Sequence, residues 1–249
     1  MSEVYQKCVV AFVDLLGFKQ ALNNPENAKG ILEILQQIKQ GEKSNCSAKT
    51  EIIGSVTEIQ ITPTVSAFSD NIVISISEKL FEGAVSWRHA VIEILNIIQQ
   101  LANLVIQKGF LLRGGITVGD LYHEKGIVFG PALVHAYHLE SKEAVFPRVL
   151  ASQELVDCFN SDKNGGTTEC FIEDDKERYY LDYLPVALTH SCLNQTYQNI
   201  IQEKILQLMK AASYDERAKK ILAKWFWFEK YHLETINRIA LPDTIIEDV

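Results

Sequence analysis

CVVAFVDLLGF (residues 8–18) is an apolar, β-branched run that reaches a single aspartate, Asp14, and then a tight turn at Gly17. Such a run predicts a buried strand, and glycine suits a turn where the backbone bends or approaches a ligand. A second run, AFSDNIVISI (residues 67–76), carries Asp70 beside its own turn. A buried carboxylate is costly unless it is paired or bound to a cation. Either aspartate alone is compatible with a structural, hydrogen-bonded residue, whereas the two together favour a paired metal site.

Hydrophobic periodicity and turn residues predict the elements around the two aspartates. They indicate one or two helices between Phe18 and about Gln40, a polar loop over 40–50, strand-like runs over 51–66 interrupted by Pro63, a strand over 71–77, a long helix from Trp87 to Lys108 closed by Gly109, strands over 110–118 and about 126–129, and a helix from about Pro131. The order is β-α-β-β-α-β, the split arrangement of ferredoxin-like α+β folds.

The two aspartates fall on strands that this topology makes neighbours. Its first and third strands are antiparallel at the centre of the sheet, so we expect Asp14 and Asp70 side by side. Two close carboxylates repel unless they share a proton or bind a cation, and oxygen ligands alone favour Mg²⁺ or Mn²⁺. Backbone N–H groups of the turn at 15–18 are suited to bind phosphate. The pattern therefore indicates two-metal phosphoryl or nucleotidyl chemistry.

Four motifs in this order resemble those of class III nucleotidyl cyclases. FVDLLGF is similar to their first metal motif, F-x-D-[IL]-x-G-F, and FSDN lies where they carry their second metal aspartate. RGGITVG (113–119) resembles their R-x-G-I-x-x-G strand, and GPALVHAYHLES (130–141) resembles their helix G-x-x-V-N-x-A-A-R-L-E-S. The closer resemblance is to the pyrimidine cyclases of bacterial Pycsar antiphage systems, whose PRxxxS and D-Y-L segments have counterparts at 147–152 and 182–184. The resemblance covers roughly residues 8–187.

The resemblance implies a class III cyclase domain over residues 1–187, an α+β, ferredoxin-like core in which helices cover an antiparallel-containing sheet. Beyond Pro185, the segments 193–212 and 215–239 have helical periodicity with few glycines and no prolines. These segments predict a C-terminal α-helical extension over 188–249, packed on the cyclase domain or on a partner subunit.

The resemblance also implies the residues of the active site. Asp14 and Asp70 would hold two Mg²⁺ or Mn²⁺ ions, with Leu15 as a further metal ligand, and Arg113 would neutralise triphosphate charge. A buried ion pair is the alternative for Arg113, because it stands in an otherwise apolar strand. The implied nucleotide-binding residues are Phe12, Leu15, Leu16, Gly17, Phe18, Ser66, Phe68 and Arg113.

The departures from the adenylyl cyclase pattern concern the base and the transition state. The transition-state Asn and Arg of adenylyl cyclases fall at Val134 and His138, and their purine-reading Lys falls at Ser66. Their second base contact falls at Pro131 or Ala132. A site without these donors and acceptors no longer reads adenine, which argues against ATP. Hydroxyl and backbone groups can meet the O4 and N3–H of uracil, so UTP is favoured, with CTP as the alternative.

Composition narrows the class of protein. The 249 residues carry a net charge of −8, which disfavours nucleic-acid binding, and the five cysteines fit reduced thiols. We find no signal-peptide pattern in MSEVYQK and no apolar run near the length of about 18 residues that a membrane span needs. The sequence therefore predicts a cytoplasmic protein that does not bind membranes or nucleic acid directly.

Together these observations predict a uridylate cyclase that makes cyclic UMP and pyrophosphate, with a cytidylate cyclase as the alternative. The family pattern implies a homodimer with two sites at its interface, whose product activates a separate effector in antiphage defence. A catalytically silent, cyclase-like module that dimerises or binds nucleotide is a further hypothesis. A diguanylate-cyclase-like enzyme would need a G-G-[DE]-E-F hairpin, which FSDN does not match.

Overall fold

The computed structural model describes residues 4–41, 46–52, 55–80, 86–161, 170–188 and 191–240. The chain divides into two compact units, Met1–Asp182 and Tyr183–Val249. We expected a boundary after residue 187. The division falls earlier because the backbone N–H groups of Tyr183 and Leu184 donate to the Tyr231 hydroxyl, at 2.9 and 3.3 Å, within the second unit.

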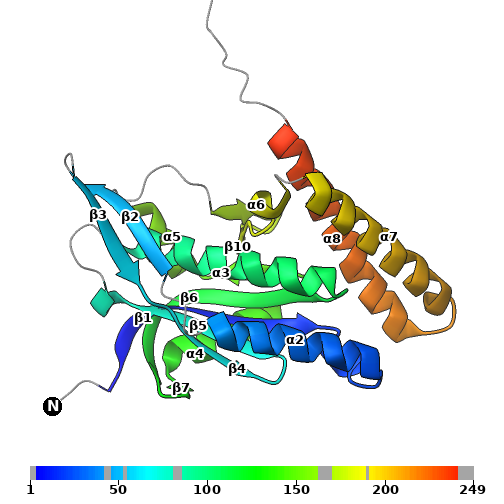
Figure 1. The fold of residues 1–249 in the computed structure, drawn as a ribbon, viewed down its shortest axis with the longest axis horizontal. Helices are drawn as coiled ribbons and strands as arrows, with labels where there is room; N and C mark the ends of the chain where they lie inside the picture. The colour runs from blue at the N-terminus through cyan, green and yellow to red at the C-terminus, as the bar shows by residue number, and fades with distance from the viewer. Residues whose placement is uncertain are drawn as a thin grey trace, which may run out of the picture. The chain divides into compact units, whose positions relative to one another are not determined.

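The first unit contains all of the strands that the structure describes (Figure 1). Its elements are β1 (Gln6–Leu16), α1 (Phe18–Ala21), α2 (Pro25–Gly41), β2 (Cys46–Ile52), β3 (Ser55–Ile61), β4 (Thr64–Phe68), β5 (Asn71–Ser77), η1 (Glu78–Leu80), α3 (Trp87–Gln107), β6 (Leu111–Glu124), β7 (Ile127–Phe129), α4 (Pro131–His138), the π-helical turn η2 (Leu139–Glu143), β8 (Val149–Ala151), α5 (Gln153–Ser161), β9 (Phe171–Glu173) and β10 (Tyr179–Leu181).

The main sheet has the order β4-β5-β1-β6-β8-β10-β9, with β7 paired to β6. Strands β4, β5, β1 and β6 are antiparallel neighbours in the ferredoxin-like order, and β6 pairs with β8 in parallel. Strand β1 lies at the centre of the sheet, and its Val9, Val10 and Ala11 are therefore fully buried. The predicted α+β fold class is confirmed.

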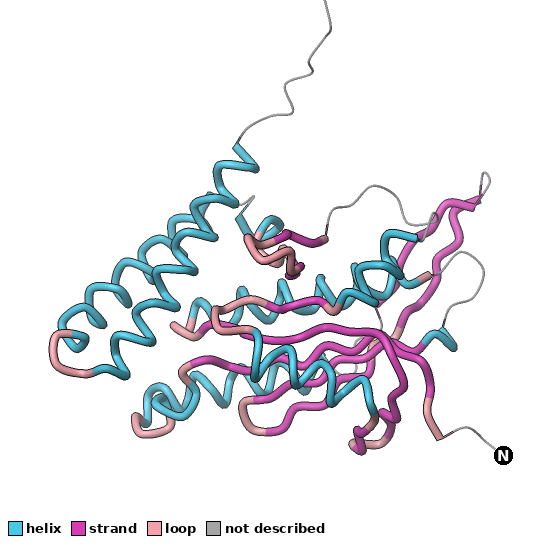
Figure 2. The backbone as a smooth tube through the Cα atoms, turned by 180° about the vertical axis from the view of Figure 1, so that it is seen from behind, coloured by secondary structure: helices cyan, strands magenta, loops and turns pink. Residues whose placement is uncertain are grey.

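Helices cover both faces of this sheet. Helices α2 and α3 lie on one face and α4 lies on the other, as the opposite views of Figures 1 and 2 show. The glycines of the RGGITVG segment explain how closely α4 approaches. A Cβ atom at Gly115 would collide with the Ala136 carbonyl oxygen, and one at Gly119 would lie 3.3 Å from the Ala132 Cβ. Gly115 must therefore be glycine, and a side chain at Gly119 would require a small shift of α4, because α4 packs directly on the β6 backbone.

Two sequence predictions for this unit need correction. The prediction of a polar loop over 40–50 was wrong in part. Strand β2 begins at Cys46 and pairs with β3 in a separate two-stranded sheet. Pairing along the hairpin satisfies its backbone groups, and a polar composition does not reveal such pairing. Strand β6 continues to Glu124 rather than ending near residue 118, because its last residues, Tyr122 to Glu124, pair with β7.

Helix α3 is long and apolar enough to cross a membrane, judged by length and composition alone. The prediction that no apolar run approaches the length of a membrane span was therefore wrong for Trp87–Gln107. In the structure, Val91, Ile94 and Ile98 are fully buried, and α3 packs on β1, β5 and β6. These contacts are typical of the core helix of a folded domain. Such a helix can be as long and as apolar as one that spans a membrane.

The second unit is helical where the structure describes it. It contains α6 (Pro185–Leu188), α7 (Ser191–Ala212) and α8 (Glu216–Ala240), and α7 and α8 pack against each other as a helical hairpin. Its core is formed by Tyr197, Phe228 and Tyr231, all buried. The predicted C-terminal α-helical extension is confirmed.

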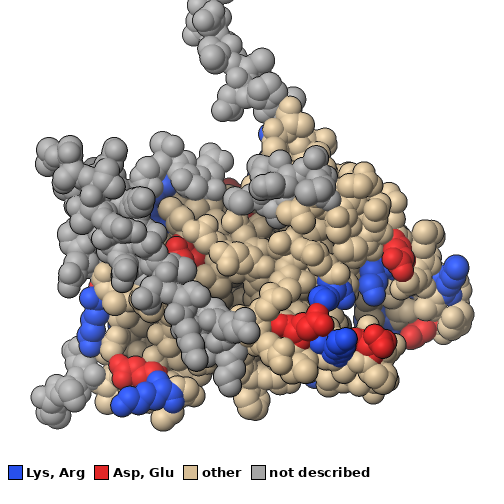
Figure 3. Space-filling model, in the orientation of Figure 1, with Lys and Arg blue, Asp and Glu red and all other residues tan. Residues whose placement is uncertain are grey.

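Charged side chains on the described surface are mixed in sign. On the face shown in Figure 3, Lys and Arg side chains lie among Asp and Glu side chains instead of forming a basic stripe. The net charge of the whole chain is −8. A nucleic-acid-binding face usually gathers basic side chains, so this face lacks that electrostatic signature.

Candidate active site

The carboxyl end of β1 brings the two predicted aspartates together. Asp14 pairs in register with Asn71, the residue after Asp70. The N–H of Leu15 donates to the carbonyl of Asp70 at 3.0 Å. The β-ladder therefore fixes the backbones of both aspartates beside each other, as the strand order predicted.

Asp70 is positioned by a two-residue hairpin turn. Phe68 pairs with Asn71, so Ser69 and Asp70 form the loop between β4 and β5. Ser69 has a φ of 60°, the left-handed conformation that tight hairpin turns require. The Asn71 side chain donates to the Asp70 carboxylate at 3.2 Å. The turn thus holds this carboxylate at the edge of the sheet, where a ligand can reach it.

Arg113 links Asp14 to a glutamate that sequence reasoning missed. It pairs in register with Asp14, and its Nη2 lies 3.4 Å from the Asp14 Oδ2. The same guanidinium forms an ion pair with Glu140, whose side chain is only 4% exposed, and its Nη1 donates to the carbonyl of Ala144 at 3.4 Å. The ion pair that we kept as the alternative for Arg113 is therefore present. The signal for Glu140 was the L-E-S end of the 130–141 segment.

The turn after β1 keeps part of its predicted phosphate-binding capacity. Gly17 has a φ of 97°, which favours glycine, and its carbonyl accepts the first hydrogen bond of α1, from Ala21. The Leu15 N–H donates to the carbonyl of Asp70 in this structure. The amides that can still serve are those of Leu16, Gly17 and Phe18. The Leu15 and Phe18 side chains are buried in the core, so only their backbones can face a nucleotide.

The donor set suits a hard divalent cation. Within the described ranges, no cluster of three or more His, Cys, Asp and Glu side chains forms a complete metal site. Asp14 and Asp70 would thus supply two carboxylates and Leu15 a backbone carbonyl, all oxygen ligands. Mg²⁺ is commonly held in this way, by one or two carboxylates together with water and substrate phosphates. The residues present therefore fit Mg²⁺ or Mn²⁺ bound together with a triphosphate.

Ser66 lies beside a histidine that had no assigned role. The Nε2 of His123 is 2.8 Å from the Ser66 Oγ, and its Nδ1 is 2.8 Å from the Ser75 Oγ. Burial lowers the pKa of His123 to about 4, so the imidazole is neutral at pH 7. This contact could not be found from the sequence, because β6 was expected to end before His123.

The remaining predicted residues lie on the same face of the sheet. The register places Phe12 opposite Val73 and Gly115, and its ring makes an edge contact with Tyr137 of α4, with centroids 5.5 Å apart. Phe68 is 82% exposed. The face that carries α4 is therefore also the face of Asp14, Arg113 and Ser66.

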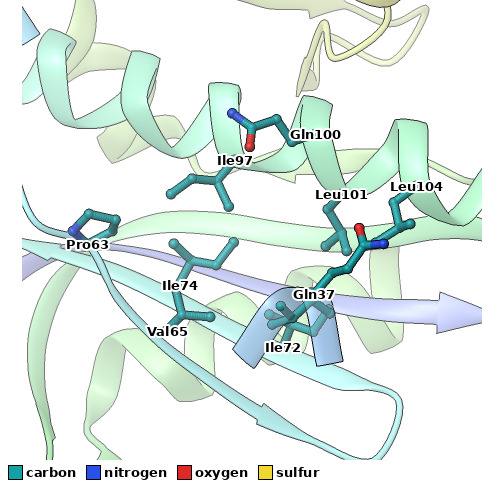
Figure 4. A pocket seen from close by; sticks show the side chains of 10 residues that line it. Gln37, Pro63, Val65, Ile72, Ile74, Ile97, Gln100, Leu101 and Leu104 are labelled. Carbon is teal, nitrogen blue, oxygen red and sulfur yellow. The ribbon is translucent and has the colours of Figure 1, made fainter. Parts of the chain in front are cut away.

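A separate cavity of about 200 Å³ lies on the opposite face, between the sheet, α2 and α3 (Figure 4). Figure 4 shows Ile74 and Ile97 facing each other across it, with the amides of Gln37 and Gln100 nearby. Among the described residues, no charged side chain lines it. The described residues that line it are Gln37, Ile38, Pro63, Val65, Ile72, Ile74, Ile97, Gln100, Leu101 and Leu104. This cavity is not the site of the carboxylates.

The PRxxxS segment has a structural role in this fold. Arg148 forms a buried ion pair with Asp174 at 2.7 Å, and Asp174 also bonds Arg178 at 2.7 Å. Burial of the Asp174 carboxyl raises its pKa, but hydrogen bonds from Arg178, Lys176 and Arg148 outweigh burial and hold the pKa well below its usual range. Ser152 accepts a hydrogen bond from Thr117 at 2.8 Å. These residues join β8 to its neighbours and do not reach the carboxylates.

No protein-family model and no curated protein matches this sequence. Among solved structures, it is similar to the monomeric guanylyl cyclase domain of the RhoGC fusion protein from the aquatic fungus Blastocladiella emersonii, at 13% identity over 72% of this chain and 95% of that one, with a TM-score of 0.44. It is also similar to an adenylate/guanylate cyclase/hydrolase from Silicibacter pomeroyi, at 18% identity over 71% and 95% of the two chains, with a TM-score of 0.37. Because these TM-scores are low, the proposal below rests on the residues and topology of this chain.

Proposed function

We propose that this chain is a nucleotidyl cyclase of the class III type that converts a pyrimidine nucleoside triphosphate, UTP above all, to its 3′,5′-cyclic monophosphate. The observation that carries the proposal is the β1–β5 register, which sets Asp14 beside Asp70 at a glycine turn. Paired carboxylates next to backbone amides suit an enzyme that binds a metal–triphosphate complex.

In the reaction, the ribose 3′-oxygen forms a bond to the α-phosphorus, the bond to the β-phosphate oxygen breaks, and pyrophosphate leaves. The 3′-hydroxyl proton passes to solvent. When bound, two divalent ions, Mg²⁺ or Mn²⁺, would supply the positive charge that lowers the pKa of the 3′-hydroxyl and neutralises the leaving group. Asp14 and Asp70 would hold these ions, and the amides of Leu16, Gly17 and Phe18 would orient the outer phosphates. Arg113 holds Asp14 in place through the ion pair that it shares with Glu140.

A homodimer is supported by the exposed apolar side chains on the face that carries the site. Phe68 of β4 is 82% exposed, and Val134 and Tyr137 of α4 are 67% and 51% exposed. Exposed large apolar side chains on one face favour a protein interface over solvent. An isologous dimer of this face would place two sites at its interface.

The motif resemblance extends the proposal to a biological role. A cytoplasmic uridylate cyclase with Pycsar-like motifs would release cyclic UMP as a second messenger. The messenger would then activate a separate effector protein in antiphage defence. The catalytically silent module is disfavoured because both aspartates and the glycine turn are intact.

Incubation with an equimolar mixture of the four ribonucleoside triphosphates and Mn²⁺ tests the choice of base. We expect cyclic UMP to be the main product, because no charged side chain that could read a purine stands at Ser66, Pro131 or Ala132. Mass spectrometry of the products provides the measurement. Predominant cyclic CMP would transfer the assignment to a cytidylate cyclase, and predominant cyclic AMP would contradict the pyrimidine proposal.

A further inference from the structure

Three polar side chains from three strands form a continuous hydrogen-bonded chain on the face of the proposed site. They are Ser75 of β5, His123 of β6 and Ser66 of β4, joined by two contacts of 2.8 Å each. Ser75 and His123 are buried, whereas Ser66 is partly exposed. The chain therefore runs from the interior of the sheet to a surface where a ligand can meet Ser66.

The proton positions in this chain follow from Ser75. Its side chain is 3% exposed, and among the described residues its hydroxyl contacts only the Nδ1 of His123. A buried hydroxyl whose proton has no acceptor costs about 1–3 kcal/mol. The Ser75 hydroxyl therefore donates to Nδ1. A neutral imidazole carries one proton, so that proton must lie on Nε2.

The position of the His123 proton also determines where the Ser66 hydroxyl proton points. With its proton on Nε2, His123 donates to the Ser66 Oγ. The Ser66 O–H is then left to donate to a group outside the chain. A serine hydroxyl has one proton and two lone pairs, so with one lone pair facing His123 the proton of Ser66 points away from His123, toward the surface.

We propose that Ser75 and His123 are positioning residues that fix the Ser66 hydroxyl as a hydrogen-bond donor toward the substrate base. Such a donor pairs with a carbonyl oxygen, such as O4 of uracil, and meets an amine, such as N4 of cytosine, unfavourably. The choice of ligand rests on the proposed cyclase function, whereas the direction of the hydrogen bonds does not.

The histidine tautomer can be measured without any activity. ¹⁵N-labelled histidine in the full-length chain gives separate ring-nitrogen resonances for protonated and unprotonated positions, and comparison with His123→Gln assigns those of His123. We expect a proton on Nε2 in the wild type, and a mixture of the two tautomers in Ser75→Ala. A wild-type proton on Nδ1 would overturn the inference, whether or not the protein is a cyclase.

Selectivity provides the functional test. Ser75→Ala should lower the ratio of kcat/KM for UTP to that for CTP by roughly tenfold, because the Ser66 proton can then turn toward His123 and leave only lone pairs facing the base. Ser66→Ala should give a similar ratio, and the double variant should change it no further. Ser77→Ala is the matched control, since its hydroxyl lies on the same strand but bonds Gln6. An unchanged ratio in Ser75→Ala would contradict the inference, whereas wild-type protein that cyclises neither nucleotide would contradict the proposed function.

Discussion

Asp14→Asn and Asp70→Asn should each lower the rate of cyclisation by at least about a thousandfold, since each removes a charge that holds the metal–triphosphate complex. The folded state should survive both changes. Asn keeps the volume of Asp, Arg113 retains its ion pair with Glu140, and Asp70 lies in a surface turn. Turnover of UTP with Mn²⁺ and thermal melting provide the two measurements.

Asp120→Asn is the matched control for these two variants. Asp120 is an exposed carboxylate of β6, and in the sheet it pairs with Lys7 at the opposite end of β1 from Asp14. We expect wild-type turnover in this variant. Near-normal turnover in Asp14→Asn or Asp70→Asn would show that the two-metal assignment is wrong.

Arg113→Ala should reduce the free energy of unfolding by about 3–5 kcal/mol, the usual cost of breaking a buried ion pair by removing one partner. The reason is Glu140, whose nearly buried carboxylate loses the guanidinium that neutralises it. Arg113→Ala combined with Glu140→Gln should recover a large part of the loss, because the uncompensated charge is then absent. Urea denaturation of the single and double variants measures both effects.

An exposed ion pair offers the comparison for Arg113. Lys108 and Glu33 lie 2.5 Å apart with both side chains well exposed, so Lys108→Ala should leave the urea midpoint close to that of the wild type. If Arg113→Ala unfolded like the wild type while losing activity, Arg113 would act on the triphosphate and not through the ion pair.

The parts of the site that could be predicted from sequence depend on strand order. The β-α-β-β-α-β pattern gave the neighbours of β1, and with them the position of Asp14 beside Asp70. The glycine turn at Gly17 was also predictable, because a left-handed residue at the end of a buried strand leaves little choice of amino acid.

The parts that could not be predicted depend on contacts between distant side chains. Glu140 reaches Arg113 from the π-helical turn η2, which widens the helix after α4, and the periodicity of an α-helix does not reveal such a turn. His123 reaches Ser66 and Ser75 because β6 extends past its expected end. The Leu15 N–H donates to the carbonyl of Asp70 because backbone pairing of the sheet extends into the turn.

The most direct test of the central claim, that the Asp14–Asp70 site cyclises a pyrimidine nucleotide, is ³¹P NMR of UTP incubated with the wild-type protein and Mn²⁺. We expect the resonances of 3′,5′-cyclic UMP and pyrophosphate to grow in equal amounts and to stop growing when EDTA is added. Formation of UDP and inorganic phosphate, or UTP that stays intact in the presence of Mn²⁺, would contradict the claim.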